Sequence, residues 1–489
     1  MVTDEQWEHL TTLAQDYPLI PVFKILPAHT RSPLDTFKIL KTVSRQCFIL
    51  ESLEDTEHRG RYTFLGYDPK LEITCTDGVV RIKNGMALQF ETQDPGAYIT
   101  HILEENRSPC LPELPPFSGG LVGYFSYDYI KYREPALNLD GIDEEGFKDL
   151  DLMLFDKIIA YDHTLERLIL IHHIKTNALK ENYNRALGDL EHVSALIQTG
   201  TAVEPPPLRL CSPFKGLFDE ERYCAMVRRA QEYIREGDIF QVVLSNRLEA
   251  TAEGSLFTTY QVLRRLNPSP YMFYFSSDDL EIAGSSPETM VKLVGDQVFT
   301  FPLAGTRPRG KTPAEDAALE QDLLKDPKEL AEHTMLVDLG RNDLGKIAAF
   351  GSVQVEKYRS VEKFSHVMHL GSTVQGRLKE GKTPLDAIDA VLPAGTLSGA
   401  PKIRACQIIN ELENNKRGIY GGALGYLGFS GAMDTCIAIR LVFKKNGKVF
   451  IRSGAGIVAD SVPAKEFEEC SNKLKAVLLA LEEAGGASA

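Results

Sequence analysis

The feature that most restricts the fold is the way the strands of this sequence follow one another. Segments with strand character at Glu288–Val294 and Gln297–Pro302 are separated by a single Gly-Asp pair. Thr435–Phe443 and Val449–Ile457 are joined through Asn446-Gly447, a pair that favours a type I′ turn between antiparallel strands. Strands therefore arrive as hairpins and do not alternate regularly with helices. This order predicts largely antiparallel sheets in an α+β fold.

Apolar spacing and capping residues divide the rest of the chain into helices and short strands. Further strands are expected at Cys47–Leu53, Tyr62–Tyr67, Leu71–Thr74, Val79–Ile82 and Gln241–Ala250. Helices are expected at about Thr3–Gln15, Thr176–Thr199, Asp219–Glu236, Pro327–Leu339, Pro384–Val391, Lys402–Asn414 and Pro463–Glu483. The proline-bearing stretch Gly200–Lys215 is the best candidate for a linker, so we divide the chain into residues 1–205 and 216–489.

Charge and cysteine content exclude several classes of function. The chain of 489 residues has 54 basic and 68 acidic side chains, and its net charge of −14 opposes binding to nucleic acid or to an anionic membrane. Its eight cysteines form no C-x-x-C pair, which predicts reduced thiols and no cysteine metal site. Neither a targeting peptide nor an apolar run of roughly 20 residues is apparent, so we expect a cytoplasmic protein.

The segment GTRPRGKT, residues 305–312, matches the phosphate-loop pattern GxxxxGK[ST] letter for letter. A phosphate loop needs converging backbone N–H groups. Pro308 removes one donor from the middle of this loop. Arg307 and Arg309 add long side chains where small ones are needed. We therefore expect another role for the segment, with nucleotide hydrolysis as an alternative from a different class.

Two predicted helices begin alike, with a proline followed by two glutamates. Glu329 and Glu332 in one helix, and Glu466 and Glu469 in the other, are each three residues apart and share a helix face. Favourable interaction with the helix dipole is sufficient to explain each pair by itself. If the two helices face each other, however, four carboxylates converge, and Mg²⁺ suits such a set of oxygen ligands.

Arg440 interrupts an apolar segment that is predicted to be a strand. Cys436 and Ala438 are expected on the same face of that strand and would leave space beside a buried guanidinium. Such an arginine suits a carboxylate ligand, and an edge-strand arginine that reaches solvent is the equally weighted alternative. On the partner strand, Gly454 and Gly456 permit close approach of backbone to a ligand.

Several segments together resemble the chorismate-utilising enzymes, and most closely the anthranilate synthase large subunits within that family. The resemblance covers about Asp219–Lys475 densely and the N-terminal region weakly. It is carried, in order, by SPETM, PLAGTRPRG, KELAEHTMLVDLGRNDLG, VMHL, LPAGTLSGAPK, RGIYGGALGY, SGAGIV and EFEECSNK. It implies an α+β fold of two large, mostly antiparallel sheets packed as a sandwich with helices outside.

The resemblance also implies a magnesium-dependent site for chorismate. Glu332 and Glu469 would bind Mg²⁺ directly, with Glu329 and Glu466 acting through water. The implied substrate contacts are Gly305, Thr306, Tyr420, Arg440, Gly454, Gly456 and Lys473.

The family's catalytic residues match three positions of this chain. Glu288 corresponds to the general acid, with Thr396 lining the substrate ring beside it. His369 matches the histidine of the second step, in which pyruvate is lost. Whether it acts as a base or orients the substrate is open at this stage.

Two positions separate the branches of the family. Isochorismate and salicylate synthases carry a water-activating lysine where this chain has Gln241, and aminodeoxychorismate synthases often carry a lysine where it has Ala304. The resemblance thus implies ammonia attack at carbon 2 of chorismate and release of anthranilate, the first committed step of tryptophan biosynthesis. Aminodeoxychorismate synthase component I is the nearest alternative.

The same resemblance implies partners and a regulator. No glutamine amidotransferase region is apparent in the sequence, so we expect a separate amidotransferase subunit to supply ammonia in a hetero-oligomer such as a heterotetramer. The region 1–205 would be regulatory, with tryptophan as feedback inhibitor; a catalytically silent tryptophan-binding subunit is the alternative. The implied inhibitor contacts are Leu50, Glu51, Ser52, Pro270 and Met272.

Overall fold

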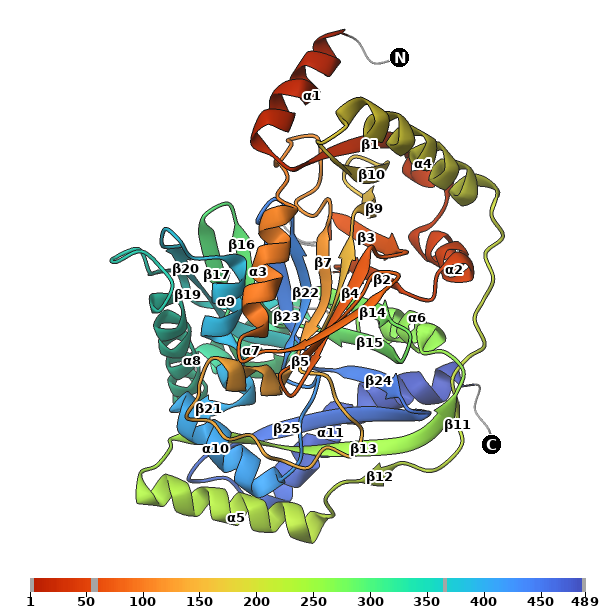
Figure 1. Cartoon of the computed structure of the whole chain (residues 1–489). Coiled ribbons are helices and arrows are strands. Elements are labelled where there is room, and N and C mark those ends of the chain that lie inside the picture. Colours follow the sequence, from red (N-terminus) through yellow and green to blue (C-terminus); the bar gives the residue numbers. More distant parts are fainter. Residues whose placement is uncertain (1–3, 54–59, 364–366, 486–489) are drawn as a thin grey trace.

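Two large antiparallel sheets form the molecule in the computed structural model, which describes residues 4–53, 60–363 and 367–485 (Figure 1). The first sheet has 13 strands. Its spatial order is β1 (Leu19–Pro27), β10 (Arg167–Lys175), β9 (Lys157–Asp162), β3 (Tyr62–Tyr67), β2 (Cys47–Glu51), β14 (Tyr271–Ser276), β15 (Leu280–Ser286), β24 (Leu441–Lys445), β25 (Lys448–Ile457), β13 (Gln241–Glu253) and β11 (Arg209–Leu210), with β12 (Lys215–Gly216) and β21 (Gly399–Ala400) also on β13.

The second sheet has 12 strands. Its order is β18 (Leu303–Pro308), β20 (Val367–Arg377), β17 (Gln297–Thr300), β16 (Thr289–Val294), β23 (Met433–Ile437), β22 (Ala423–Gly428), β7 (Gly120–Phe125), β8 (Leu150–Phe155), β4 (Leu71–Thr76), β5 (Val79–Lys83) and β6 (Ala87–Glu91), with β19 (Gln354–Lys363) on β20. The predicted α+β fold with two large antiparallel sheets is confirmed.

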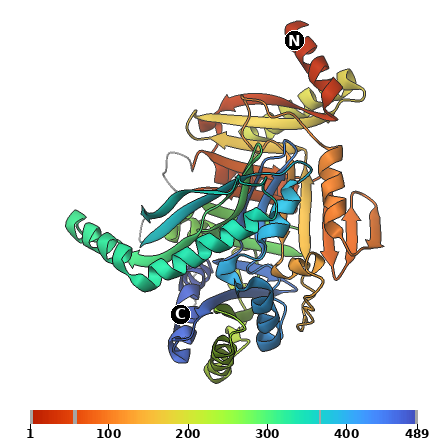
Figure 2. The ribbon, with the colours of Figure 1, turned by 90° about the vertical axis from the view of Figure 1, so that its left-hand side faces the viewer.

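Helices cover the outer faces of the sheets, and Figure 2 shows α7 and α8 following one another beside the strands of the second sheet. The helices are α1 (Asp4–Asp16), α2 (Pro33–Val43), α3 (Pro95–Glu105), α4 (Leu179–Thr199), α5 (Glu220–Glu236), α6 (Phe257–Leu266), α7 (Pro313–Lys325), α8 (Pro327–Gly345), α9 (Pro384–Val391), α10 (Lys402–Glu413) and α11 (Pro463–Ala484). Three short 3₁₀ helices are η1 (Ala28–Thr30), η2 (Tyr127–Tyr132) and η3 (Gly395–Leu397).

An aromatic core lies between the two sheets. Phe48 of β2 packs edge-on against Phe155 of β8 at 4.8 Å between ring centroids, and Phe64 packs similarly on Tyr426 at 6.1 Å. These residues belong to one continuous buried cluster that draws side chains from both sheets. Because strands from both sheets contribute to it, this cluster fixes one layer against the other.

The predicted linker lies in mostly irregular chain between α4 and α5, with only the two-residue strands β11 and β12. Strands from both sides of it pair within both sheets: β2 pairs with β14, and β7 pairs with β22. The two sequence regions are therefore joined by continuous hydrogen-bonded ladders. Their division into a regulatory and a catalytic part stays a prediction.

The prediction of one strand over Thr435–Phe443 is wrong. β23 ends at Ile437 in the second sheet, and β24 begins at Leu441 in the first. Between them Arg440 has a φ of 50°, in the left-handed region that side chains other than glycine rarely adopt. The expected placement of Cys436 and Ala438 beside Arg440 on one strand face is wrong for the same reason. Local apolar alternation does not reveal that a chain changes sheets.

Candidate active site

Glu288 and Arg440 lie at neighbouring points where the chain crosses between the sheets. Glu288 stands between β15 of the first sheet and β16 of the second, and Arg440 stands between β23 and β24. Two backbone hydrogen bonds join these crossovers: Ile437 N–H donates to the Glu288 carbonyl at 2.9 Å, and Ser285 N–H donates to the Arg440 carbonyl at 3.1 Å. The two functional side chains therefore have rigidly related backbones.

The Glu288 carboxyl is bound by a residue 108 positions further along the chain. The Thr396 hydroxyl of η3 donates to its Oε2 at 3.1 Å. Burial raises the pKa of Glu288, against the opposing effects of the Thr396 hydrogen bond and the positive charges of Arg440 and Lys473. A carboxyl with a raised pKa retains its proton closer to neutral pH, as a general acid must.

His369 of β20 faces the segment that resembles a phosphate loop. Its Nδ1 lies 2.8 Å from the Gly305 carbonyl and 3.1 Å from the Thr306 hydroxyl. A carbonyl oxygen only accepts, so the proton is assigned to Nδ1 and Nε2 is the acceptor nitrogen. Burial, aided by the positive charge of Arg440, lowers the pKa of His369 and favours the neutral ring.

The segment at residues 305–312 is not a phosphate cradle. Leu303–Pro308 is strand β18, and Arg307 binds Asp322 at 2.6 Å and Asp326 at 2.8 Å. The amides that follow are already used: Gly310 N–H donates to Asp316 at 2.8 Å, and Lys311 N–H to Glu315 at 2.9 Å. Amides held by carboxylates are not available to phosphate oxygens.

The four glutamates predicted to bind metal begin α8 and α11. Burial raises the pKa of Glu332, and the negative charges of Glu329 and Glu469 raise it further. Burial likewise raises the pKa of Glu466, with Glu469 adding to the effect. Among the described residues no three of these four carboxylates lie within 4.8 Å of one another. The carboxylates of the two helices are therefore close enough to affect one another's pKa values, but they are not close enough for three of them to bind one ion directly.

These side chains fit a hard divalent cation. All four offer carboxylate oxygens, which are the ligands that Mg²⁺ prefers. Their negative charges also repel one another, and a bound cation would remove that repulsion. Lys473 partly offsets the repulsion, since its Nζ lies 2.7 Å from Glu469 and also donates to the Gly454 carbonyl at 3.0 Å. Both partners of that ion pair are half exposed, so the pair is open to exchange with a ligand.

The two glycines predicted on β25 lie against functional side chains. A Cβ on Gly454 would come within 2.7 Å of the Leu244 carbonyl and 3.1 Å of the Tyr420 hydroxyl. A Cβ on Gly456 would come within 2.7 Å of the Gln241 side-chain amide. The structure therefore brings Tyr420, Gly454, Gly456 and Gln241 together.

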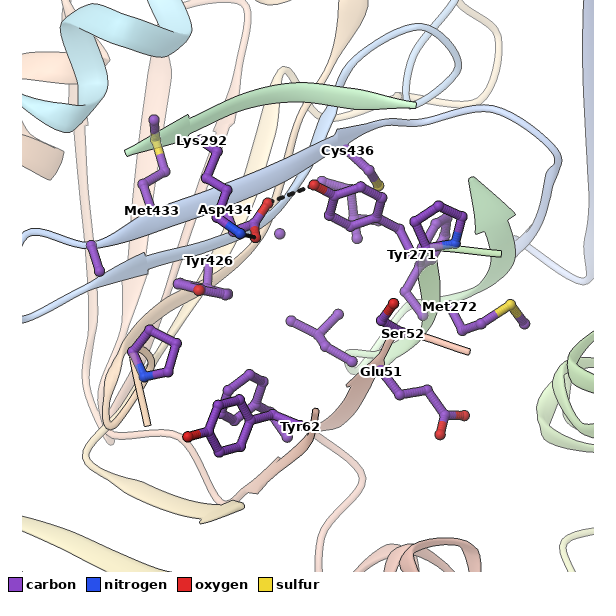
Figure 3. Close-up of a pocket in the computed structure, with 18 of the residues that line it drawn as sticks. Glu51, Ser52, Tyr62, Tyr271, Met272, Lys292, Tyr426, Met433, Asp434 and Cys436 are labelled. Atoms are coloured by element: carbon purple, nitrogen blue, oxygen red, sulfur yellow. Dashed lines mark hydrogen bonds and ion pairs between the residues drawn. The ribbon is translucent and has the colours of Figure 1, made fainter. Parts of the chain in front are cut away.

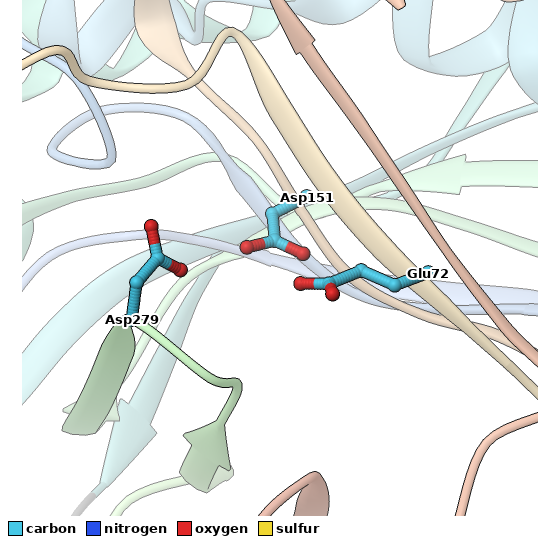
Figure 4. Close-up of side chains that lie close together, drawn as sticks. All are labelled: Glu72, Asp151 and Asp279. Atoms are coloured by element: carbon cyan, nitrogen blue, oxygen red, sulfur yellow. The ribbon is translucent and has the colours of Figure 1, made fainter. Parts of the chain in front are cut away.

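A second acidic group, formed by Glu72, Asp151 and Asp279, lies elsewhere in the molecule (Figure 4). Its carboxylate oxygens are within 4.8 Å of one another. Lys148 already supplies a cation, with its Nζ 2.8 Å from both Asp151 and Asp279. Burial and Asp151 raise the pKa of Glu72 to about 7. Because Lys148 already binds two of the three carboxyl groups, these residues are not counted among the candidate metal ligands.

A cavity of about 340 Å³ is lined by residues of β2, β14, β16, β22 and β23 (Figure 3). All five residues predicted to bind the inhibitor line it, namely Leu50, Glu51, Ser52, Pro270 and Met272. The Ser52 hydroxyl is buried and has no hydrogen-bond partner within the described ranges. A buried hydroxyl without a partner is costly, and Ser52 is among the residues that line the cavity.

The Glu51 carboxylate is bound on the side away from the cavity. Arg264 donates to it at 2.6 and 3.2 Å, and the Tyr260 hydroxyl donates to it as well. Figure 3 shows its side chain directed away from the other labelled residues. Protein donors therefore already hold this carboxylate, and the assignment of Glu51 as an inhibitor contact stays a prediction.

Sequence reasoning missed the polar residues of the opposite wall. The Tyr271 hydroxyl donates to Asp434 at 2.7 Å and lies 2.8 Å from the Thr289 hydroxyl, and Lys292 lies 3.1 Å from Asp434 (Figure 3). Tyr271 lies inside the NPSPYMFY segment, so it was adjacent to a predicted position. Asp434 and Lys292 carry no local signal, because only the pairing of β16 with β23 brings them together.

The sequence matches the family described as chorismate binding enzyme over residues 45–479. The chain belongs to this family. A relative named anthranilate synthase component 1, from Acetivibrio thermocellus, is 43% identical over 98% of both chains, and one of the same name from Aquifex aeolicus is 43% identical over 97% of both. The resemblance to the chorismate-utilising enzymes, and most closely to anthranilate synthase large subunits, is confirmed.

Solved structures of chorismate-binding enzymes agree with this assignment. Anthranilate synthase component I from Streptococcus pneumoniae has a TM-score of 0.74 at 39% identity, covering 87% of this chain and 93% of that one. The menaquinone-specific isochorismate synthase from Escherichia coli has a TM-score of 0.68 at 18% identity over 97% of this chain and 98% of that one, and shows the shared fold alone. Within the described ranges no helix has the length and apolarity to span a membrane.

Proposed function

We propose that this chorismate-utilising enzyme is the synthase subunit of an anthranilate synthase, aminating chorismate at carbon 2 and then eliminating pyruvate. The observation that carries the proposal is the Glu288–Thr396 pair beside Arg440, since it combines an acid of raised pKa with a cation for a carboxylate. Relatives named anthranilate synthase component 1 support the choice of reaction.

In the first step Glu288 would donate its proton to the carbon-4 hydroxyl. That hydroxyl leaves as water while ammonia forms a bond to carbon 2 and then loses a proton. Arg440 and Tyr420 would hold the enolpyruvyl carboxylate. Gln241, whose amide lies against Gly456, has no basic group that would activate water, which disfavours hydroxylation at carbon 2.

In the second step His369 would act as the base. Its assigned Nδ1–H tautomer leaves Nε2 to accept a proton from carbon 2 of the aminated intermediate. The enolpyruvyl ether bond then breaks, the ring becomes aromatic, and the leaving enolpyruvate takes up a proton to give pyruvate. The lowered pKa of His369 keeps the ring neutral and able to accept that proton.

Glu332 and Glu469 would hold Mg²⁺, with Glu329 and Glu466 acting through water. When bound, the ion supplies charge neutralisation for the ring carboxylate of chorismate. Lys473 would move from its pairing with Glu469 toward the same carboxylate. Ammonia would come from a glutamine amidotransferase subunit in a hetero-oligomer, and we propose a cytoplasmic location.

The cavity beside Ser52 would bind tryptophan as a feedback inhibitor. Its volume of about 340 Å³ lies in the usual range for sites of small organic ligands, and apolar side chains such as Met272 and Phe64 line it. Ser52, one of the lining residues, would supply a polar contact to the amino or carboxylate group of the inhibitor.

The deciding experiment supplies chorismate, Mg²⁺ and ammonium to the purified chain and identifies the products by mass and fluorescence. Anthranilate and pyruvate in equal amounts are expected. Persistent aminodeoxychorismate would instead identify the nearest alternative, and unchanged chorismate would leave only a tryptophan-binding role. Addition of tryptophan then tests the inhibitor site, because an unchanged rate at saturation contradicts regulation.

A further inference from the structure

A buried arginine lies behind the candidate active site. The Arg417 side chain is 1% exposed, and its Nη1 donates to the Leu397 carbonyl at 2.6 Å and its Nη2 to the Val243 carbonyl at 2.7 Å. Nε and Nη2 also donate to Glu413 at 2.9 and 2.5 Å. All three guanidinium nitrogens are therefore held in one geometry, which the planar fork of arginine permits and a lysine ammonium does not.

Glu413 joins Arg417 to a second buried arginine. Arg452 Nη2 donates to Glu413 at 2.7 Å, and Arg452 Nε donates to the Ser245 hydroxyl at 2.8 Å. The Ser245 N–H also donates to the Glu413 carboxylate, at 2.7 Å. This Arg417–Glu413–Arg452 triad buries two positive charges and one negative charge. Buried ion networks generally add little stability beyond a well-packed apolar core, so the distinctive effect of the triad is to fix geometry.

Several contacts of the triad end on segments that carry a candidate site residue. Leu397 follows Thr396 in η3. Val243 and Ser245 belong to β13, which begins at Gln241, and Arg452 precedes Gly454 by two residues on β25. The centroid of the Tyr420 ring lies 5.9 Å from the Arg417 guanidinium carbon.

We propose that Arg417 is the positioning residue of this active site: through the Leu397 carbonyl it holds the Thr396 hydroxyl against Glu288. This inference rests on the proposed function, in which Glu288 is the acid. The peptide that follows Thr396 is fixed by a charge-assisted hydrogen bond of 2.6 Å. The Thr396 hydroxyl is thereby kept 3.1 Å from the carboxyl whose pKa it lowers.

The test compares Arg417→Lys, Thr396→Val and the double variant. Arg417→Lys keeps the positive charge but removes the planar guanidinium group that donates in several fixed directions. We expect about a 30-fold loss of kcat, within the range of misplaced catalytic groups. We also expect the alkaline limb of the kcat–pH profile to move to higher pH in both single variants, because each loses the hydrogen bond that lowers the pKa of Glu288. The double variant should lose no more kcat than the more damaging of the two single variants, because both remove the same hydrogen bond. Multiplicative losses or an unmoved limb would overturn the proposal.

Asp162→Asn is the matched control. Asp162 is also a buried carboxylate between two arginines, Arg61 at 2.9 Å and Arg167 at 3.3 Å, and it lies outside the active site. It should lower the thermal midpoint without moving the pH profile. Glu413→Gln replaces Arg417→Lys if the latter fails to fold.

A crystal structure of Arg417→Lys supplies a readout that does not depend on activity. The Thr396 hydroxyl should leave hydrogen-bond distance of Glu288. If it stays at 3.1 Å the positioning role is excluded, whereas a wild-type chain that consumes no chorismate contradicts the proposed function alone.

Discussion

The candidate active site and the cavity adjoin the same strands, β16 and β23, yet their charges are arranged in opposite ways. On the cavity side Glu51 is satisfied by Arg264, and Asp434 by Lys292 and Tyr271. On the active-site side Glu332 faces two further carboxylates. A site whose like charges face one another is suited to receive a cation and an anionic substrate. A cavity whose ions are already paired is suited to an apolar ligand with few polar groups.

The strongest test of the comparison is the removal of one acidic ligand. We expect Glu469→Gln to lower kcat/KM by more than about 10³-fold, since even outer-shell partners of a metal contribute roughly 10–100-fold. Mn²⁺ binding followed by electron paramagnetic resonance should weaken in parallel. Glu468→Gln, at the neighbouring exposed position of α11, is the control. Equal activity of the two variants would contradict the assignment of Glu469.

The next test concerns the acid. Glu288→Gln should lower kcat by about 10²–10⁴-fold, the usual contribution of general acid catalysis. In the wild type the protonated carboxyl is the active form, so kcat should fall as the pH rises through the raised pKa of Glu288. That descending limb should be absent in the variant. If the variant keeps the descending limb of its kcat–pH profile, a group other than Glu288 is responsible for that limb.

A smaller loss is expected at the histidine. His369→Ala should slow anthranilate release by about 10²-fold and accumulate the aminated intermediate, because only the second step requires the base. Mass spectrometry of quenched reactions measures both species. Anthranilate formation at the normal rate would remove the role assigned to His369.

On the cavity side the effects should be on regulation. Tyr271 lines the cavity and contacts Thr289, the neighbour of Glu288, so it is a hydrogen-bonded connection between the two sites. Tyr271→Phe should weaken tryptophan inhibition about 10-fold, a coupling of ordinary size. Calorimetric titration of tryptophan should be run beside the kinetics. Inhibition that matches the wild type would show that the sites communicate by another route.

The smallest effect is expected in the paired acidic network. The pKa of Glu72 is raised from 4.5 to about 7, so the folded state keeps a proton that the unfolded chain releases. Stability should therefore fall as the pH rises from about 4.5 to 7. Glu72→Gln should remove this dependence and stabilise the protein by about 1–2 kcal/mol at pH 8. Thermal midpoints at pH 5 and pH 8 measure the difference.

Sequence reasoning succeeded where the signals are local. Helix α9 has the predicted bounds Pro384–Val391, because Thr383 and Asp386 form a capping box and Pro384 follows the cap. Helix α8 continues beyond the predicted Leu339 to Gly345. Gly340 does not end it: a Cβ there would lie 3.1 Å from the Thr300 hydroxyl of β17 and 3.6 Å from Pro302, so the helix packs closely on the second sheet at this glycine. Tertiary packing there overrides a residue with low helix propensity.

In the candidate active site, too, local sequence signals do not reveal contacts between distant parts of the chain. The residues were found through their motifs, but the Thr396–Glu288 hydrogen bond joins positions 108 residues apart, and the sheet change at Arg440 leaves no periodic trace. The engaged state of Glu51 was equally invisible, since Arg264 lies 213 positions away. Long-range pairing decided which predicted residues meet.

The shared position of Glu288 and Arg440 has a mechanical consequence. Glu288 lies where the chain passes from the first sheet to the second, and Arg440 lies where it passes back from the second sheet to the first. A small slide of one layer over the other would displace both together, so proton donor and anion clamp would gain or lose alignment as a unit.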